Sequence, residues 1–273
     1  MHEVSKSISD AGVVRASAPF RYLFLLGVLA GTYIAFAAYT SSVATFGLWD
    51  DPSTRGLARF LAGTIFPGGL ILIIVAGGEL FTGNTMMLLP LAERRITLAG
   101  LLRNWVIVYL GNFIGAAFIA WMIFCSGQFN TGNHLFGGIT IRIAAAKCDL
   151  TFCEALILGI LCNWLVCLAI TMATKAQDVA GKILAIFFPI WIFITAGFEH
   201  SIANMYYVPA GLLAASNPSW LEAANLSPEA LASLTGTNFL YANLLPVTLG
   251  NIIGGGGFVA LAYGWAIGPA ESR

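Results

Sequence analysis

The chain has 273 residues, of which 58% are hydrophobic and only 10% are charged, and its formal net charge is zero. Ordinary soluble domains carry about 25% charged residues, so this composition excludes a water-soluble fold and indicates a protein with several membrane spans. The balanced charge gives no sign of nucleic-acid binding.

Long runs without Asp, Glu, Lys or Arg mark the hydrophobic segments, and a helix needs about 20 apolar residues to cross the hydrocarbon core. The pattern predicts an all-α membrane protein with six transmembrane helices. The expected spans are residues 22–47, 58–90, 104–126, 152–174, 182–214 and 238–267. The second and fifth spans are too long for one straight crossing, and both contain polar residues, so we expect these two helices to be broken.

The distribution of Lys and Arg favours both termini in the cytoplasm. In that orientation the cytoplasmic segments hold Lys6, Arg15, Arg21, Arg94, Arg95, Arg103, Lys175, Lys182 and Arg273. The outer segments hold Arg55, Arg59, Arg142 and Lys147. The first residues show no signal-peptide pattern, so we expect the first hydrophobic segment to stay in the protein.

Three motifs of the first half recur in the second half in the same order. AGGELFTGN at residues 76–84 is echoed by AGFEHSIAN at 196–204, and LGNFIG at 110–115 by LGNIIG at 249–254. A weaker echo relates GVLAGTYIAFA at 27–37 to GILCNWLVCLA at 159–169. Chance similarity between Gly- and Ala-rich helices is the alternative for any single pair.

Because each half then contains three spans, an odd number, the second half is inverted relative to the first. Many channels and transporters have this plan, with a site at the midplane where broken helices meet. The expected division is a cytoplasmic N-terminal segment (1–21), a first three-helix repeat (22–126), an outer connecting loop (127–151), a second three-helix repeat (152–267) and a cytoplasmic tail (268–273).

Glu79 and Glu199 occupy equivalent places in the repeat, each just before an expected helix break. An ionisable group within a span is by default a functional hypothesis. The structural alternative, which we favour, is that these carboxylates and the equivalent Asn84 and Asn204 bind backbone N–H groups freed by the break. The helices that follow each break direct their N-termini at the midplane, which favours anions.

His200 differs from these four residues, because its repeat partner is Leu80 and symmetry does not explain it. Its unperturbed pKa of about 6.5 permits proton exchange near neutral pH. We therefore predict that His200 contacts the solute and exchanges a proton. A buried histidine with satisfied hydrogen bonds is the structural alternative.

Four stretches, GGELFTGNTM, LCNWLVCLA, AGFEHSIANM and LPVTLGNIIGG, together resemble the formate/nitrite transporter family, and the resemblance covers nearly the whole chain. It implies a homo-pentamer of six-span protomers in the inner membrane, with an aquaporin-like pore in each. Such a protein is a channel rather than an enzyme and needs no cofactor or metal. Its solutes are small weak-acid anions, with formate favoured and nitrite or hydrosulfide left open.

The resemblance also implies a set of pore residues. Leu80 and Thr82 lie where the second span breaks, and Phe193 matches a constricting phenylalanine. The further residues implied are Phe66 and Leu70 at the constriction, Asn163 and Asn251 in the pore region, and Lys147 as an outer cation that attracts anions. The N-terminal segment resembles a pH-dependent cytoplasmic plug.

A bare anion cannot cheaply cross a slit lined by Leu80 and Phe193, because desolvating a charge is costly. Either Thr82, backbone N–H groups and a cationic His200 accompany the anion, or it takes a proton and crosses as the neutral acid. We favour the protonation-assisted route, with His200 and water both open as the proton source.

Two rival classes are less consistent with the sequence. An aquaporin-type channel for neutral solutes shares the inverted plan but should show two Asn-Pro-Ala signatures, which this chain lacks. A membrane metalloenzyme would need clustered ligands, yet His2 and His134 lie outside the expected core, which leaves too few.

Overall fold

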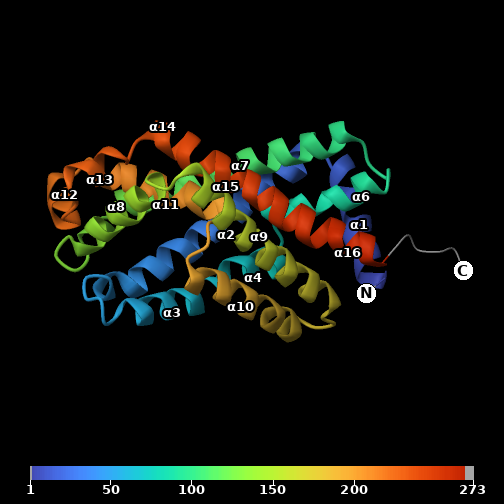
Figure 1. The fold of residues 1–273 in the computed structure, drawn as a ribbon, viewed down its shortest axis with the longest axis horizontal. Helices are drawn as coiled ribbons and strands as arrows, with labels where there is room; N and C mark the ends of the chain where they lie inside the picture. Colours follow the sequence, from blue (N-terminus) through green and yellow to red (C-terminus); the bar gives the residue numbers. More distant parts are fainter. Residues whose placement is uncertain (1, 268–273) are drawn as a thin grey trace, which may run out of the picture.

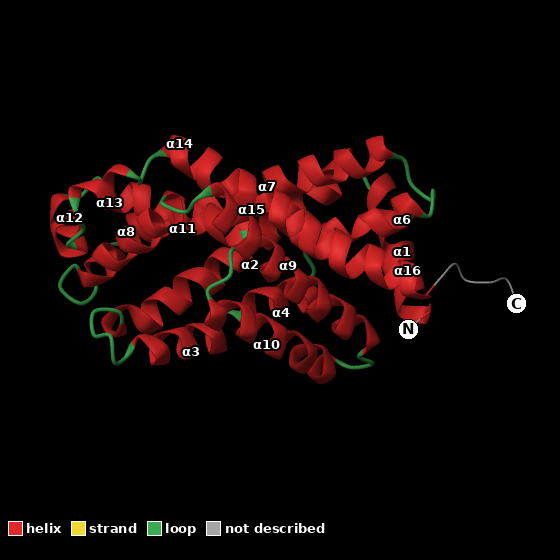
Figure 2. Ribbon diagram, viewed as in Figure 1, coloured by secondary structure: helices red, strands yellow, loops and turns green. Residues whose placement is uncertain are grey.

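The computed structural model describes residues 2–267, and within this range the chain forms helices and connecting turns without a β-strand (Figures 1 and 2). The cytoplasmic tail expected at residues 268–273 lies outside the described residues. The helices run roughly along the long axis of the molecule, and α1 and α16 lie at the same end of it (Figure 1).

The first half of the chain forms two long helices and one interrupted segment between them. Its elements are α1 (His2–Ser17), α2 (Phe20–Thr45), η1 (Phe46–Leu48), α3 (Arg55–Ile65), α4 (Pro67–Ala76), α5 (Phe81–Asn84), η2 (Thr85–Met87), α6 (Leu88–Ala92) and α7 (Leu98–Cys125). Of these, η1 and η2 are 3-10 helices.

The second half follows the same plan with more short helices near one end. Its elements are η3 (Gln128–Asn130), α8 (Leu135–Cys148), α9 (Phe152–Lys175), α10 (Val179–Ala196), α11 (Ser201–Ala214), α12 (Pro218–Ala224), α13 (Pro228–Ala232), α14 (Gly236–Asn238), η4 (Phe239–Leu244), α15 (Leu245–Asn251), η5 (Ile252–Leu261) and α16 (Ala262–Ile267). Here η4 and η5 are π-helical.

Six helical segments of the described chain are long and apolar enough to cross a membrane, which confirms the predicted number. They are Phe20–Leu48, Arg55–Ala76, Leu98–Cys125, Phe152–Lys175, Val179–Ala196 and Gly236–Ala266. The helices extend beyond several charge-free runs, since Arg103 and Lys175 lie inside them. Long cationic side chains can reach water from a helix end, so a charge-free run underestimates the helix.

Both predicted helix breaks are present. The first separates α4 from α5 at residues 77–80, and the second separates α10 from α11 at residues 197–200. Gly77 and Gly197 have φ values of 98° and 78° there. Glycine adopts such values without the steric cost that a side chain imposes, so the two glycines allow the chain to leave the helix.

Besides the short α12 and α13, two longer helices of the described chain lie outside the expected spans. The N-terminal segment forms α1, which contacts α6, α7 and α9, and the segment expected to be an outer connecting loop contains α8, which packs against α11 and α12. α8 lies at the opposite end of the molecule from α1 (Figure 1). Each of these helices therefore precedes the first span of its repeat, α2 or α9.

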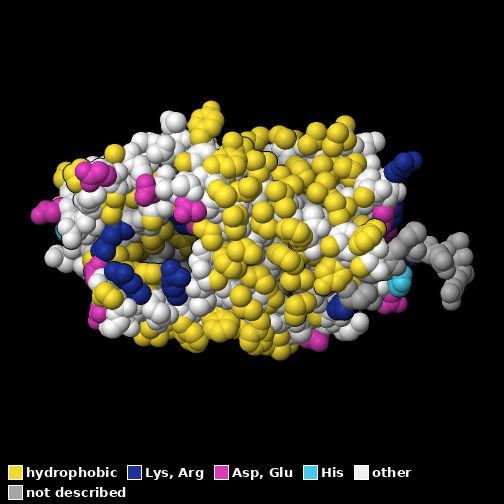
Figure 3. Space-filling view, in the orientation of Figure 1, with side chains coloured by type: hydrophobic (Ala, Val, Ile, Leu, Met, Phe, Trp, Pro, Cys, Tyr) yellow, Lys and Arg dark blue, Asp and Glu magenta, His cyan; other side chains and the backbone are white. Residues whose placement is uncertain are grey.

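Apolar side chains cover the middle of the molecule, and charged side chains gather toward its two ends (Figure 3). Helix α7 contributes strongly to this apolar surface, with Val106, Leu110 and Trp121 about half exposed. Such a surface fits contact with lipid or with other apolar helices.

Glycines allow close approach of the helices within each repeat. A methyl group at Gly31 of α2 would collide with the backbone carbonyl of Asn112 in α7, and one at Gly250 of α15 with the carbonyl of Leu156 in α9. Small residues at such crossings bring two backbones together, which is a main source of packing energy between membrane helices.

We predict that Gly31→Ala lowers the free energy of unfolding by about 1–3 kcal/mol, because the added methyl group overpacks the α2–α7 crossing. Gly56→Ala in α3 is the control, since nothing lies within 4 Å of a Cβ there. Unfolding in mixed micelles measures both variants. Equal stability of the two would contradict the close crossing.

Candidate functional site

An asparagine from α7 binds the backbone of the first break. The side-chain amide of Asn112 donates to the carbonyl oxygens of Gly27 (2.7 Å) and Glu79 (2.9 Å), and its Oδ1 accepts the N–H of Phe81 (2.9 Å). The Glu79 carbonyl and the Phe81 N–H belong to the break, where lipid offers no partner, so Asn112 replaces two of the interrupted helical hydrogen bonds. The N–H of Glu79 binds the carbonyl of Leu26 in α2 instead.

Asn251 does the same at the second break. Its amide donates to the carbonyl oxygens of Gly159 (2.8 Å) and Glu199 (3.1 Å), and its Oδ1 accepts the N–H of Ser201 (2.9 Å). We expected Asn251 in the pore region, and in the structure its side chain is bound to the backbone of the second break and of α9. Sequence reasoning did not single out Asn112, although the repeated LGN motif could have indicated it.

Glu79 is buried beside the first break and accepts side-chain donors there. Asn84 Nδ2 donates to its carboxylate at 2.7 Å, and Arg15 of α1 forms an ion pair with it at 3.2 Å. Asn104 completes the group, because its Oδ1 accepts from Asn84 and its Nδ2 donates to the backbone carbonyl of Arg15.

Glu199 has the matching partners at the second break. Asn204 Nδ2 donates to one carboxylate oxygen and Lys147 Nζ of α8 to the other, both at 2.7 Å. Asn243 takes the place of Asn104, accepting from Asn204 at 2.7 Å and donating to the backbone carbonyl of Lys147 at 3.0 Å. The carboxylates thus bind an asparagine and a cation, whereas we expected them to bind freed backbone N–H groups.

The two cations extend the repeat beyond its three spans. Arg15 and Lys147 are separated by the same interval as Gly27 and Gly159, and each lies near the end of the helix that precedes its repeat. No sequence motif relates α1 to α8, so this correspondence appears only in the hydrogen bonds. Each repeat therefore contains an additional helix whose cation neutralises a buried carboxylate.

Between the two breaks, Thr82 meets His200. Thr82 Oγ1 lies 3.0 Å from His200 Nε2, and His200 Nδ1 accepts the backbone N–H of Ala203 at 3.1 Å, so the ring caps α11. A nitrogen that accepts a hydrogen bond carries no proton, which places the hydrogen of the neutral ring on Nε2, donating to Thr82.

Aromatic and aliphatic side chains enclose this polar pair. The ring of Phe193 stacks on His200 with centroids 6.1 Å apart, and Phe66 meets Phe193 edge-on at 5.7 Å. Leu70 and Leu80 are buried in the same core. We call the buried side chains of Phe66, Leu80, Thr82, Phe193 and His200 the central barrier.

Asn163 of α9 connects the segment that follows the first break to Asn251 of α15. Its amide donates to the carbonyl oxygens of Thr82 (3.1 Å) and Asn251 (2.6 Å) and to the hydroxyl of Thr85 (3.1 Å). The structure thus places Asn163 in contact with the backbone of Thr82, next to the central barrier.

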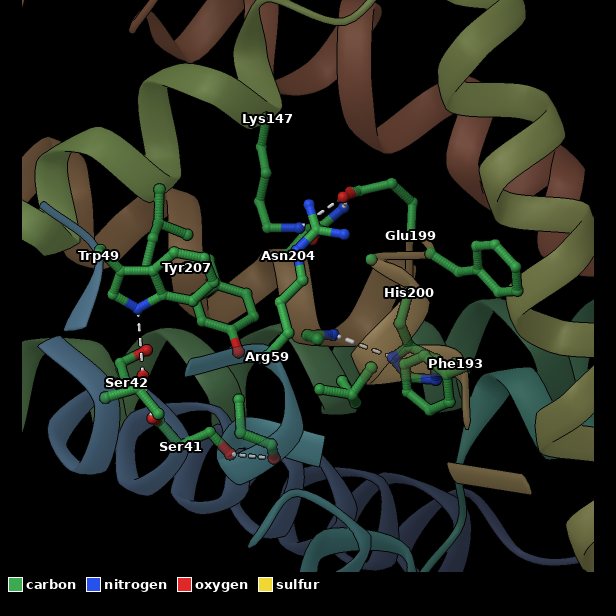
Figure 4. Close-up of a pocket in the computed structure, with 17 residues that line it drawn as sticks. Ser41, Ser42, Trp49, Arg59, Lys147, Phe193, Glu199, His200, Asn204 and Tyr207 are labelled. Carbon is green, nitrogen blue, oxygen red and sulfur yellow. Dashed lines mark hydrogen bonds and ion pairs between the residues drawn. The ribbon is translucent and has the colours of Figure 1, made fainter. Parts of the chain in front are cut away.

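A cavity of about 170 Å³, the α8 vestibule, opens beside the central barrier toward the α8 end of the molecule (Figures 3 and 4). Its labelled lining residues in Figure 4 are Ser41, Ser42, Trp49, Arg59, Lys147, Phe193, Glu199, His200, Asn204 and Tyr207. A second cavity of about 280 Å³, the α1 vestibule, includes Ser7, Ile8, Ala11, Arg15 and Lys182.

Lys147, which the resemblance implied as an outer cation, lines the α8 vestibule, but its charge is not free. Its ammonium is 2.7 Å from Glu199, with side-chain exposures of 15% for Lys147 and 8% for Glu199, and lies 5.1 Å from the ring centre of Tyr207.

Within residues 2–267, no group of three or more His, Cys, Asp or Glu side chains is placed to hold a metal ion.

Comparison with known proteins gives consistent matches along the chain. The profile of a family described as "Formate/nitrite transporter" matches residues 2–265. The "Probable formate transporter" of Methanothermobacter thermautotrophicus is 37% identical, covering 96% of this chain and 94% of that protein. "Formate channel FocA" of Escherichia coli K12 is 38% identical, covering 97% and 92%.

A solved structure, "Pentameric formate channel with formate bound", is similar to this fold. It superposes with a TM-score of 0.83 at 37% identity, covering 91% of this chain and 97% of its own.

We predict that Lys147→Met lowers the free energy of unfolding by about 3 kcal/mol, because it leaves the buried Glu199 carboxylate without its cation. Combining it with Glu199→Gln should recover most of that loss. Denaturation in mixed micelles gives the free energies of unfolding of the wild type, the two single variants and the double variant. Arg142→Met is the control: its pair with Asp50 is more exposed, so we expect a loss below about 1 kcal/mol. A small loss for Lys147→Met would argue against a tight pair.

Proposed function

Because the chain belongs to the formate/nitrite transporter family, we propose that it is a membrane channel whose main solute is formate, passed with the help of protonation. The observation that carries this proposal is the contact between Thr82 and His200, which places two hydrogen-bonding side chains inside an apolar barrier adjoining the α8 vestibule. The names of the relatives support formate over other weak-acid anions.

The central barrier is suited to a neutral acid more than to a bare anion. Phe66, Phe193 and Leu80 provide no compensation for a lost hydration shell, and burying an unpaired charge is far more costly than burying a hydrogen-bonded neutral group. Formic acid keeps two oxygens that can accept hydrogen bonds. Nε2–H of His200 and the hydroxyl of Thr82 are donors at the required place.

We propose that water in a vestibule, rather than the His200 ring, supplies the proton. Nδ1 accepts the N–H of Ala203, so a second proton on the ring would set two donors against each other and remove the cap of α11. The neutral ring would then act by donating from Nε2. The capping contact of Nδ1 therefore supports water over the His200 ring, the two proton sources that the sequence leaves open.

We further propose a homo-pentamer in the inner membrane with both termini in the cytoplasm. The pentameric relative supports the assembly, and the exposed apolar face of α7 offers a surface for lipid or neighbouring protomers. The excess of Lys and Arg at the α1 end supports the orientation. Helix α1 lines the α1 vestibule, and its role as a pH-dependent plug stays a prediction.

Uptake into proteoliposomes tests the function. We expect formate to enter faster than chloride and glycerol, and the rate to rise as pH falls because the fraction of formic acid grows. Nitrite and hydrosulfide belong in the same series as the alternative solutes. Protein-free liposomes correct for direct permeation of the acid. Formate uptake no faster than in those liposomes would refute the proposal, and glycerol uptake alone would favour a neutral-solute channel.

His200→Asn tests the source of the proton. Asparagine can cap α11 and keep an N–H donor near Thr82, but it does not titrate. We expect uptake to slow by about tenfold from the poorer hydrogen bond, with its pH dependence retained. His134→Asn is the control, since His134 has a positive φ of 73° that asparagine tolerates. Loss of the pH dependence in His200→Asn alone would show that the ring delivers the proton.

A further inference from the structure

The α8 vestibule carries an uncompensated positive charge. The charged side chains in its lining are Arg59, Lys147 and Glu199. Lys147 and Glu199 neutralise each other at 2.7 Å, and the neutral tautomer of His200 adds no charge. Arg59 takes part in none of the ion pairs formed within residues 2–267. The net charge of the lining therefore resides on Arg59.

The position of Arg59 brings this charge close to the central barrier. Arg59 lies in α3 and extends into the vestibule (Figure 4). Its Nη1 is 3.6 Å from the point where a Cβ of Gly197 would stand, in the second helix break. Gly197 follows Phe193 by one helical turn. The guanidinium thus faces the backbone that connects Phe193 to His200.

Arg59 does not stabilise the nearby end of α10 by hydrogen bonds. The carbonyl oxygens of Phe193 and Ile194 are bound by the backbone N–H groups of Phe198 and Gly197. The structure gives the Arg59 guanidinium no hydrogen bond to any described residue, so its five N–H donors are available to an external acceptor.

We infer that Arg59 is the residue that binds the planar oxyanion in the α8 vestibule before it reaches the central barrier, a site that rests on the proposed formate channel for the identity of its ligand. The parallel N–H groups of a guanidinium match the two oxygens of a carboxylate, which a point charge cannot do. Formate and nitrite have this geometry, whereas chloride and hydrosulfide do not. Lys147 is paired with Glu199 and holds the Glu199 carboxylate in place, so the binding of the anion falls to Arg59.

The concentration dependence of formate uptake from the α8 side tests this inference. Arg59→Gln should raise the half-saturating formate concentration about tenfold and leave the maximal rate within about twofold. Arg59→Lys keeps the positive charge but lacks the parallel N–H groups, so it should raise the half-saturating formate concentration by an intermediate amount. Arg55→Gln is the matched control, because Arg55 lies one turn earlier in α3, outside the vestibule lining, and its Nε donates to the carbonyl of Trp49. The inference would be overturned if Arg59→Gln lowered the maximal rate without changing the half-saturating formate concentration. It would also be overturned if Arg59→Gln and Arg55→Gln raised that concentration equally.

A second measurement reports binding without transport. Phenylglyoxal modifies accessible arginines, and mass spectrometry can compare Arg59 with Arg55 in the purified wild-type protein. Formate and nitrite should slow the modification of Arg59 several-fold, whereas chloride at equal ionic strength should not. Protection of Arg59 in a protein that fails to transport formate would refute the proposed function and keep the site. Formate transport with no protection of Arg59 would refute the site alone.

Discussion

An interrupted helix inside a membrane must find hydrogen-bond partners for its freed backbone groups, and this requirement organises the whole fold. Asn112 and Asn251 meet much of it, each binding one carbonyl oxygen and one N–H of its break and one carbonyl oxygen of the first helix of its repeat. The N–H groups of Glu79 and Glu199 bind carbonyl oxygens of that first helix, at Leu26 and Leu158. Because each asparagine comes from the third helix of its repeat, it fixes that helix against the first helix and the break together. The positions of His200, the last residue of the second break, and of Thr82, two residues beyond the first break, follow from these bonds.

Electrostatic compensation follows the same two-fold plan. Each break has a buried carboxylate, and each carboxylate binds an asparagine five residues later and a cation from the helix that precedes the repeat. An unpaired charge at such a place would be strongly unfavourable, so Arg15 and Lys147 serve the fold before any solute arrives. In the α8 vestibule this division leaves Arg59, which pairs with no carboxylate among residues 2–267, as the cation available to an anion.

Much of this arrangement was predictable from the sequence, and the remainder has a physical reason. Six spans and two breaks follow from apolar runs and from motifs that are contiguous in the chain, whereas Phe193 was indicated by the family resemblance. Asn104 and Asn243 could not be found in this way, because each acts on a residue far away in sequence and is unremarkable in its own helix. The helix α8 was also missed, since its 14 residues are too few to suggest a span and its burial depends on packing against α11 and α12.

The repeat fails at one place that matters for the proposed channel: His200 begins one post-break helix and Leu80 begins the other. A solute arriving from opposite ends therefore meets different chemistry first, so the energy profile along the axis is lopsided. Such a profile can make the current–concentration curves of the two directions differ. It cannot by itself create a net flow, because microscopic reversibility requires the passive fluxes to cancel at equal electrochemical potential. Only the gradients of the weak acid and of protons can then decide whether a cell exports or recovers it.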